Sequence, residues 1–354
     1  MKNIEKLKKN FTNKKILITG HTGFKGTWLT MIFILLGARV YGISKNYPTK
    51  FYKNLRLRNV KNYIFDLKDV NKTKKTLNTI KPDFIFHLAA QAIVSKSYTN
   101  PIETWNSNLI SFLNILESLR NFKKKVNVVM ITSDKCYLNV EKKEGYKENE
   151  RLGGFENYSA SKASCEILFN SYFHSYFKKL KFVKIVSARA GNVIGGGDWS
   201  KDRLIPDIIR GLNANKIIKI RSLSSTRPWQ HVLDPLFGYI SLAINLKKNQ
   251  KINGQSFNIG PFKSKNFSVG KVLERFKSKY KNIKWKVNNK EIFKEQNLLN
   301  LNCTKIEKKI GWRNKYNFNL TVDKTIEWYK NYNVKNSRQL TESQILEYIS
   351  FNEK

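Results

Sequence analysis

The sequence has few cysteines and no long apolar run. Its three cysteines, Cys136, Cys165 and Cys303, are odd in number and show no Cys-x-x-Cys spacing. The spacing therefore predicts neither a disulfide framework nor a metal site, and we expect a reducing compartment such as the cytoplasm. The longest apolar run, residues 28–36, is much shorter than the roughly 20 residues that cross a bilayer. No apolar signal core follows the basic residues 1–10, so we expect no membrane partner.

Acidic residues are also scarce. The chain has 26 Asp and Glu against 66 Lys and Arg, which gives a formal net charge of +40. A charge of this size is compatible with nucleic-acid binding. No RNA- or DNA-binding motif accompanies it, and lysines spread over all solvated faces would give the same total. We therefore predict no nucleic-acid partner, and we expect the diffuse charge to attract a pyrophosphate-bearing substrate.

The composition indicates a packed globular protein. Of 354 residues, 41% are hydrophobic and 13% aromatic, enough for one large α/β domain or two interlocked ones. A series of short apolar runs has the character of strands buried on both faces of a parallel sheet. These runs are residues 15–19, 39–43, 63–65, 84–90, 126–131 and 182–186.

The first of these runs leads into a glycine-rich turn. The segment Gly20-His21-Thr22-Gly23-Phe24-Lys25-Gly26 lies between a predicted strand and a predicted helix over 27–36. Glycines in this context let the backbone turn sharply and approach a pyrophosphate at the helix N-terminus. The pattern predicts a Rossmann-type, doubly wound α/β fold that binds NAD. The residues expected to bind NAD are Gly20, Thr22, Gly23, Phe24, Gly26, Asp66, Leu67, Ala89, Tyr158 and Lys162.

One familiar part of an NAD site is missing. An acidic residue at the end of the second strand usually binds the ribose hydroxyls of NAD, but this strand is followed by Ser44-Lys45-Asn46. The absence argues against tight NAD binding and leaves NADP open through Lys45. Asp66, after the third strand, either accepts a hydrogen bond from the adenine or caps the next helix. We interpret His87 as a packed strand residue.

A cluster of polar residues follows the fifth predicted strand. Ser133, Asp134 and Lys135 lie at the carboxyl end of the sheet, where ligands bind in such folds. In the helix predicted over 158–177, Tyr158 and Lys162 lie one turn apart on one face. A phenol has an ordinary pKa of about 10, so it needs a nearby cation to act as a base, and Lys162 can supply it. We predict that these five residues are catalytic.

The β–α alternation weakens after residue 190. We therefore predict an NAD-binding domain over residues 1–190, with residues 230–245 returning to it. Residues 191–354 are predicted to form a smaller C-terminal substrate-binding domain for a nucleotide sugar.

On these motifs the chain resembles the extended short-chain dehydrogenase/reductase family over nearly its whole length. Within that family it looks like the CDP-glucose 4,6-dehydratases. The glycine turn, the segment Thr132-Ser133-Asp134-Lys135-Cys136-Tyr137 and Leu152-Gly153-Gly154 carry part of the likeness. Longer runs make it specific, and they are Ala188-Arg189-Ala190-Gly191-Asn192-Val193-Ile194-Gly195-Gly196-Gly197-Asp198-Trp199, Asp202-Arg203-Leu204-Ile205-Pro206-Asp207 and Arg227-Pro228-Trp229-Gln230-His231-Val232-Leu233.

The resemblance implies an internal redox cycle on CDP-glucose. Tyr158 would take the proton of the sugar 4-hydroxyl while C4 gives a hydride to NAD. The 4-ketone then acidifies the C5 proton, water leaves across C5 and C6, and the hydride returns to C6. The expected product is CDP-4-dehydro-6-deoxyglucose, and NAD is regenerated in each turnover.

The resemblance also assigns the elimination to Asp134 and Lys135. Sister dehydratases have an Asp acid followed by a Glu base, whereas Lys135 stands in the second place here. Lys135 is either a neutral base, which requires a lowered pKa, or a charged group that stabilises the enolate. Asp134 needs a raised pKa to donate a proton. The CDP-glucose branch also carries lysine at this position.

For the substrate, the resemblance implies contacts from the second part of the chain. Asn192 is expected to contact the sugar or its phosphate, and Arg203 and Arg227 to bind the pyrophosphate, unless they form surface ion pairs. His231 is a further substrate-binding candidate, with a structural role as the alternative. The family also implies a homodimer or homotetramer, which apolar stripes near Phe112 and Tyr172 would allow.

Two alternative functions are compatible with parts of the sequence. One is an epimerase, or a different nucleotide-sugar dehydratase, of the same fold. The Asp134-Lys135 pair argues against an epimerase, which has no water to eliminate. The other is a basic, non-catalytic nucleic-acid-binding protein, against which the intact glycine turn, Tyr158 and Lys162 argue.

Overall fold

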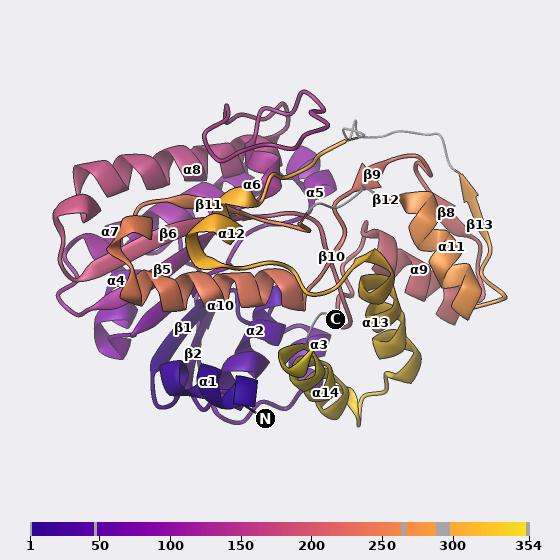
Figure 1. The fold of residues 1–354 in the computed structure, drawn as a ribbon, viewed down its shortest axis with the longest axis horizontal. Helices are drawn as coiled ribbons and strands as arrows, with labels where there is room; N and C mark the ends of the chain where they lie inside the picture. The colour runs from indigo at the N-terminus through magenta and orange to yellow at the C-terminus, as the bar shows by residue number, and fades with distance from the viewer. Residues whose placement is uncertain (1, 46–47, 263–266, 288–297, 352–354) are drawn as a thin grey trace.

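A seven-stranded sheet forms the centre of the molecule (Figure 1). The protein is described by a computed structural model over residues 2–45, 48–262, 267–287 and 298–351. The strand order is β11-β6-β5-β4-β1-β2-β3, and all neighbours are parallel. The order reverses between β1 and β4, which is the switch point where such folds bind ligands. The strands are β1 Lys15–Thr19, β2 Arg39–Ser44, β3 Val60–Ile64, β4 Phe84–His87, β5 Val126–Ile131, β6 Val183–Ala190 and β11 Ser256–Ile259.

Helices cover both faces of this sheet. Side chains alternate between the two faces of a strand, so Ile16 and Ile18 join one apolar core and Leu17 joins the other. The first core includes side chains from α1, α2 and α10, and the second includes side chains from α4, α7 and α8. Their bounds are α1 Lys2–Phe11, α2 Phe24–Leu35, α4 Val70–Ile80, α7 Ser111–Arg120, α8 Asn157–Ser175 and α10 Leu233–Lys248. The predicted doubly wound α/β sheet is confirmed.

The long helical segment over residues 101–120 is interrupted. It consists of α6 (Pro101–Trp105), a π-helical turn (Asn106–Ile110) and α7. The turn aims Asn108 inward, where its Oδ1 accepts the Gln91 N–H at 2.8 Å and its amide donates to Ser161 Oγ at 2.9 Å. Such turns often mark functional sites, and this one ties the segment after β4 to α8.

The chain returns to the sheet over a longer stretch than the predicted residues 230–245. α10 packs against β5 and β6, and β11 then adds an edge strand beside β6. α12 (Thr304–Ile310) packs on β11. The division of the chain at residue 190 into two functional domains stays a prediction.

A smaller part lies beyond one end of the sheet, on the right in Figure 1. It contains short two-stranded pairs, β8 with β13 and β9 with β12, next to α9 and α11. A third pair, β7 with β10, leads back toward α10. The elements are β7 Val193–Ile194, α9 Leu204–Asn213, β8 Ile218–Ile220, β9 Thr226–Arg227, β10 Gln230–His231, β12 Phe267–Ser268, α11 Val269–Lys279, β13 Trp285–Val287 and α13 Phe318–Asn331. The remaining short helices are α3 Lys50–Asn54 and α5 Val94–Thr99. The last helix, α14 (Ser337–Ser350), packs back on α1, α2 and α3.

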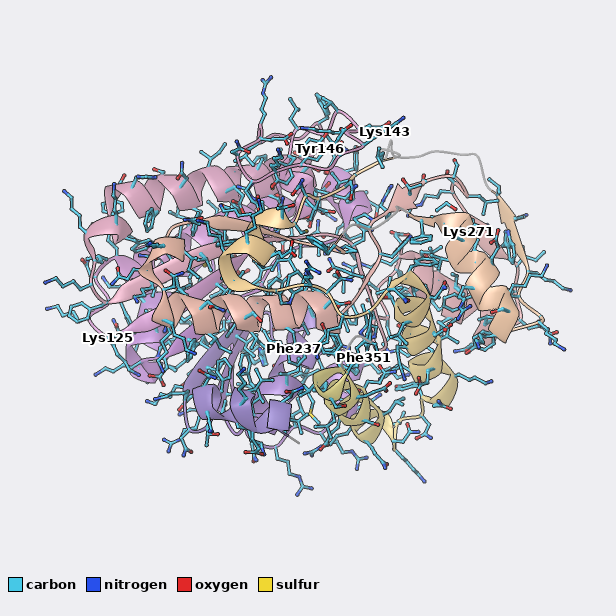
Figure 2. The ribbon with its side chains drawn as sticks, in the orientation of Figure 1. Lys125, Lys143, Tyr146, Phe237, Lys271 and Phe351 are labelled. Carbon is cyan, nitrogen blue, oxygen red and sulfur yellow. The ribbon has the colours of Figure 1, made fainter. Side chains whose placement is uncertain are left out.

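The lysines are distributed over the surface. Lys125, Lys143 and Lys271 project from three separate edges of the molecule (Figure 2). This distribution agrees with the interpretation of the net charge as diffuse. None of the described helices is both long and apolar enough to cross a bilayer. Within the described residues, no cluster of three or more His, Cys, Asp or Glu is suited to hold a metal ion.

The expected apolar stripe for subunit contact needs correction. Phe112 is 1% exposed and packs inside its own core, so it is not available to a partner. Tyr172 donates its hydroxyl to Glu117 at 3.2 Å. The exposed apolar side chains of this region are instead Ile167, on α8, and Tyr176, directly after it.

Candidate active site

A pocket lies at the carboxyl ends of β5 and β6. It is lined by residues from the glycine turn, from both strand ends, and from the smaller part of the protein. It therefore collects side chains that are far apart in the sequence. The predicted site residues that line it are Phe24, Ser133, Asp134, Lys135, Tyr158, Asn192, Arg203 and Arg227.

The polar cluster after β5 forms a short 3-10 turn, Asp134–Cys136, with Ser133 as its cap. Ser133 Oγ donates to Asp134 Oδ1 at 2.9 Å and accepts the Lys135 N–H at 3.2 Å. The two bonds fix all three residues at the pocket wall. Ser133 also hydrogen-bonds Tyr158, so the hydroxyl, the carboxyl group and the phenol form one connected group.

The N-terminus of α8 positions Tyr158. Glu156 caps the helix and accepts the N–H groups of Tyr158 at 2.6 Å and Ser159 at 2.9 Å. A Cβ at Gly154 would lie 2.4 Å from the Cβ of Ser159, so only glycine lets the preceding loop pass this close. Glu156 was missed in the sequence, although an acidic residue just before a helix is a recognisable capping signal.

The expected lowering of the Tyr158 pKa does not occur in the ligand-free chain. Burial raises the pKa of Tyr158 to about 12, although the hydrogen bond with Ser133 and the charge of Arg203 act to lower it. Burial also lowers the pKa of Lys162, one helical turn away. Arg203, from the smaller part of the protein, is a cation whose charge acts to lower the pKa of Tyr158, and the role of Lys162 stays a prediction.

Asp134 has the character that a proton donor requires. It is 2% exposed, and burial raises the pKa of its carboxyl group, against the charge of Lys135 and the Ser133 hydrogen bond. Its Oδ2 is buried and has no hydrogen-bond partner among the described residues. This oxygen faces Gly191, where an added Cβ would lie 3.2 Å away. Its catalytic role stays a prediction.

A buried ion pair behind the pocket was not found in the sequence. Glu166, on α8, binds Arg189 Nη2 at 2.7 Å, and both side chains are at most 4% exposed. Glu166 also accepts hydrogen bonds from Thr132, Ser187 and Ser256, which lie on or next to β5, β6 and β11. Burial acts to raise the pKa of Glu166, but Arg189 and these hydrogen bonds outweigh it and lower the pKa. The network holds α8 at a fixed height over the three strands.

Lys25 is a further pocket residue that the sequence did not single out. It lies in the glycine turn, lines the pocket, and its Nζ is 3.4 Å from the Tyr239 hydroxyl. Burial lowers the pKa of Lys25 to about 8, helped by the positive charges of Lys162 and Arg203 and opposed by Asp134. The pocket therefore concentrates positive charge, which suits an anionic ligand.

Replacing Lys25 with Met is expected to stabilise the ligand-free protein near pH 7. The unfolded chain keeps lysines protonated up to a pKa of 10.5, but folded Lys25 only to about 8. Between these values the unfolded state binds more protons, so the free energy of unfolding rises with pH across this window. The cost of the buried charge is present in full below pH 8 and absent above 10.5. Lys25→Met should raise the free energy of unfolding by about 1 to 2 kcal/mol at pH 7.

Urea unfolding at pH 7 and pH 10 measures this effect. The gain in the free energy of unfolding from Lys25→Met should be smaller at pH 10 than at pH 7. The control is Lys6→Met, at an exposed position of α1, and its effect on this free energy should not depend on pH in this way. A gain that is the same at both pH values, or a loss at pH 7, would contradict an unfavourable charge at Lys25.

The glycine turn has the geometry that a dinucleotide needs. Gly20 has φ +69°, and a Cβ there would lie 2.9 Å from the Ala89 backbone. A Cβ at Gly26 would lie 2.1 Å from the Gly20 carbonyl oxygen. Gly23 caps α2 without any side-chain hydrogen bond, so the first N–H groups of the helix are left for an anion. These residues fit the pyrophosphate of NAD.

The other predicted cofactor residues lie around the turn. Thr22 Oγ1 is 2.8 Å from Ser44 Oγ, which joins the turn to the end of β2. Asp66 accepts the Lys68 N–H at 3.0 Å, and the cap of α4 is Asp69. The alternative that Asp66 caps this helix is therefore wrong, whereas the adenine contact stays a prediction. Leu67 is 4% exposed, and its carbonyl oxygen accepts the Asn114 amide at 2.8 Å.

Two histidines are packed in the core. His87 Nδ1 is 2.8 Å from Thr19 Oγ1, and burial lowers its pKa to about 3, in agreement with the packed interpretation. His231 is fully buried, packs its ring against Trp28 and Tyr316, and also has a pKa lowered by burial to about 3. It is not among the residues that line the pocket, so its packing favours the structural alternative, and a contact with substrate stays a prediction.

The two pocket arginines differ in their setting. Arg203 precedes α9, is 32% exposed, and donates to Asp198 Oδ2 at 2.9 Å. Arg227, in β9, is 7% exposed and donates to the Thr226 carbonyl oxygen at 2.8 Å. Both line the same pocket wall as Asn192. Arg203 thus forms an ion pair, which was the alternative to phosphate binding, but it still lines the pocket.

A doubly wound sheet with a glycine turn after β1 and a Tyr-x-x-x-Lys pair on α8 defines a short-chain dehydrogenase/reductase fold. The family model described as GDP-mannose 4,6 dehydratase matches residues 17–325. CDP-glucose 4,6-dehydratase of Salmonella typhimurium is 38% identical over 334 residues, which cover 91% of this chain and 92% of that protein. The chain belongs to the GDP-mannose 4,6 dehydratase family. It is an enzyme of the hydro-lyase class that acts on a nucleotide sugar.

Solved structures share the fold over almost the whole chain. Epimerase Mth375 from Methanothermobacter thermautotrophicus has a TM-score of 0.80 at 21% identity and covers 96% of this chain and 98% of its own. The dTDP-glucose 4,6-dehydratase of Bacillus anthracis str. Ames, solved in complex with NAD, has a TM-score of 0.74 at 19% identity. It covers 90% of this chain and 96% of its own. These likenesses establish the fold.

Proposed function

We propose that this chain converts CDP-glucose to CDP-4-dehydro-6-deoxyglucose with bound NAD. The observation that carries the proposal is the pocket that Ser133, Asp134, Lys135 and Tyr158 share with Arg203 and Arg227. The 38% identical relative is a CDP-glucose 4,6-dehydratase, which supports CDP as the nucleotide of the substrate. NAD, when bound, accepts a hydride from C4 of the sugar and returns it to C6.

In this proposal Ser133 and Tyr158 hold the sugar 4-hydroxyl. Ser133 and Tyr158 already hydrogen-bond each other. When the sugar 4-hydroxyl lies between them, each side chain exchanges this hydrogen bond for one with the sugar hydroxyl. Tyr158 takes the proton as the hydride leaves C4. Because its pKa is raised to about 12 in the ligand-free pocket, the positive charges that face it must assist ionisation.

Asp134 and Lys135 then remove water. The 4-ketone acidifies the C5 proton, and Asp134 donates its own proton to the departing 6-hydroxyl. Its raised pKa and unpartnered Oδ2 support this role. Lys135, the next residue, either takes the C5 proton and returns it to C5 when the hydride reaches C6, or holds the enolate by its charge while another basic group of the pocket takes and returns that proton.

Arg203 and Arg227 are proposed to bind the pyrophosphate, and Asn192 the sugar or its phosphate. Guanidinium groups pair with phosphate oxygens in a two-pronged geometry, and a concave, positively charged pocket strengthens the attraction. Asp198 holds Arg203 in place through their 2.9 Å ion pair.

The test is turnover of purified protein with CDP-glucose, with and without added NAD. A 4-keto-6-deoxy product that carries deuterium from C4 of the substrate at C6 is the expected result. UDP-, GDP- and dTDP-glucose serve as competitors in parallel. Turnover of one of these but not of CDP-glucose would overturn the nucleotide assignment and keep the family. A 4-epimer without water loss would favour the epimerase alternative, and salt-sensitive RNA binding without any turnover would favour the nucleic-acid alternative.

The assembly and location predicted from the sequence are part of the proposal. A homodimer or homotetramer is supported by the exposed Ile167 and Tyr176 at α8, and the cytoplasmic location stays a prediction. Light scattering of the eluting protein measures the mass, and a monomer at micromolar concentration would contradict the predicted assembly.

A further inference from the structure

The end of β2 is where the ribose of a dinucleotide lies in this fold class. A carboxylate there binds the ribose hydroxyls and repels the 2′-phosphate of NADP. In this chain Ser44 ends the strand and Lys45 follows, so β2 itself supplies no such carboxylate. A lysine in this place would attract a 2′-phosphate if its charge were uncompensated.

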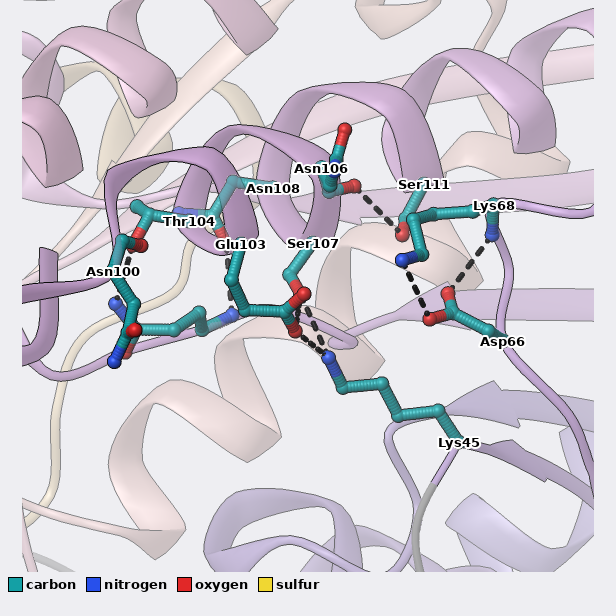
Figure 3. A network of polar contacts seen from close by, with 11 residues as sticks. Lys45, Asp66, Lys68, Asn100, Glu103, Thr104, Asn106, Ser107, Asn108 and Ser111 are labelled. Carbon is teal, nitrogen blue, oxygen red and sulfur yellow. Dashed lines mark hydrogen bonds and ion pairs between the residues drawn. The ribbon is translucent and has the colours of Figure 1, made fainter.

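The structure supplies the carboxylate from another element. Glu103, on α6, forms an ion pair with Lys45 (Figure 3). Ser107, on the π-helical turn, joins the same contact: Lys45 Nζ donates to Ser107 Oγ at 2.9 Å, and Ser107 Oγ donates to Glu103 Oε1 at 2.8 Å. Two segments that are distant in sequence, the end of β2 and the continuous stretch of α6 and the π-helical turn, therefore hold one charge pair.

The carboxylate of this triad is ionised at neutral pH. The hydrogen bond from Lys45 lowers the pKa of Glu103 below its ordinary value, with further lowering from Ser107 and Lys68 and opposition from burial. Lys68, the other cation nearby, is paired with Asp66 at 3.4 Å, as Figure 3 also shows. Each of these lysines thus has its own carboxylate.

We propose that Glu103 replaces the acidic residue missing from β2 and, by pairing with Lys45, makes the site select NAD over NADP. A 2′-phosphate at this edge would meet the carboxylate of Glu103 and would have to compete with it for Lys45. We expect this one residue to account for about tenfold selectivity, which corresponds to about 1.4 kcal/mol. The inference rests on the proposed use of a nicotinamide dinucleotide.

The experiment is titration of the folded protein with NADH and with NADPH, followed by nicotinamide fluorescence. Wild type is expected to bind NADH more tightly. Glu103→Gln should shift the ratio of the two dissociation constants about tenfold toward NADPH, because Lys45 becomes available. Lys45→Met should shift the ratio in the opposite direction, since Glu103 then lacks its partner. The double variant, Glu103→Gln with Lys45→Met, should not show the shift toward NADPH that Glu103→Gln produces alone.

Glu117→Gln is the matched control. Glu117 is also a helical glutamate in an ion pair, with Arg120 at 2.6 Å, but it lies on α7. It should leave the NADPH to NADH ratio at the wild-type value. A Glu103→Gln ratio equal to that of Glu117→Gln, or a wild type that prefers NADPH, would overturn the inference while leaving the dehydratase proposal intact. Binding of neither dinucleotide by wild type would overturn both.

Discussion

Tyr158→Phe is expected to lower kcat for the 4-keto-6-deoxy product by about 10² to 10⁴, the usual contribution of a positioned acid or base. The substitution removes only the phenol oxygen, which hydrogen-bonds Ser133 at the pocket wall. The ring, the Glu156 cap and the packing of α8 remain. Without that oxygen the sugar 4-hydroxyl has no proton acceptor, so the loss should appear in the first half of the cycle.

Deuterium at C4 of the substrate measures this step directly. The variant should leave the label at C4, with neither ketone nor water loss. For wild type, the rate of the first half should rise with pH, because the pKa of Tyr158 is raised and the base form grows as pH increases. Tyr176→Phe, just after the same helix, is the control and should match wild type. Transfer of label to C6 at the wild-type rate in Tyr158→Phe would remove Tyr158 from the redox step.

The sheet and the glycine turn could be predicted because their signals are local. A buried parallel strand appears as a short apolar run, and a sharp turn into a helix needs glycine at fixed positions, as at Gly20 and Gly26. Ser133 and Tyr158 were found for the same reason, since strand ends and helical spacing can be read along the chain.

The parts that sequence could not give depend on contacts between distant elements. Glu166 and Arg189 look like ordinary charged residues until folding buries them against each other. Lys45 looked like a possible 2′-phosphate ligand because its partner, Glu103, is 58 residues away. His231 lies in the same sequence run as Arg227, yet its ring lies in the core against Trp28 and Tyr316. The nearness of His231 to Arg227 in the sequence therefore did not predict where the His231 side chain lies.

Lys135→Ala is expected to separate the two halves of the reaction. Lys135 lines the pocket beside Asp134, whose pKa it helps to hold down, but the Ser133 and Tyr158 pair does not depend on its side chain. Oxidation at C4 should therefore continue, while the elimination slows by about 10² to 10⁴. The 4-keto sugar should accumulate with its 6-hydroxyl intact, which mass spectrometry distinguishes from the dehydrated product by one water. Lys142→Ala, which removes a surface lysine paired with Glu150, is the control.

Lys135→Arg decides which form of the lysine acts. Arginine keeps the positive charge but does not act as a base near neutral pH. If Lys135 is a neutral base, Lys135→Arg should stall like Lys135→Ala, and the C5 hydrogen should not exchange with solvent deuterium. If it is a charged stabiliser of the enolate, arginine should restore much of the elimination and the C5 exchange. An equal loss of oxidation and elimination in Lys135→Ala would contradict both roles. Asp134, with its raised pKa, would then remain as the acid, and another pocket group would have to act as the base.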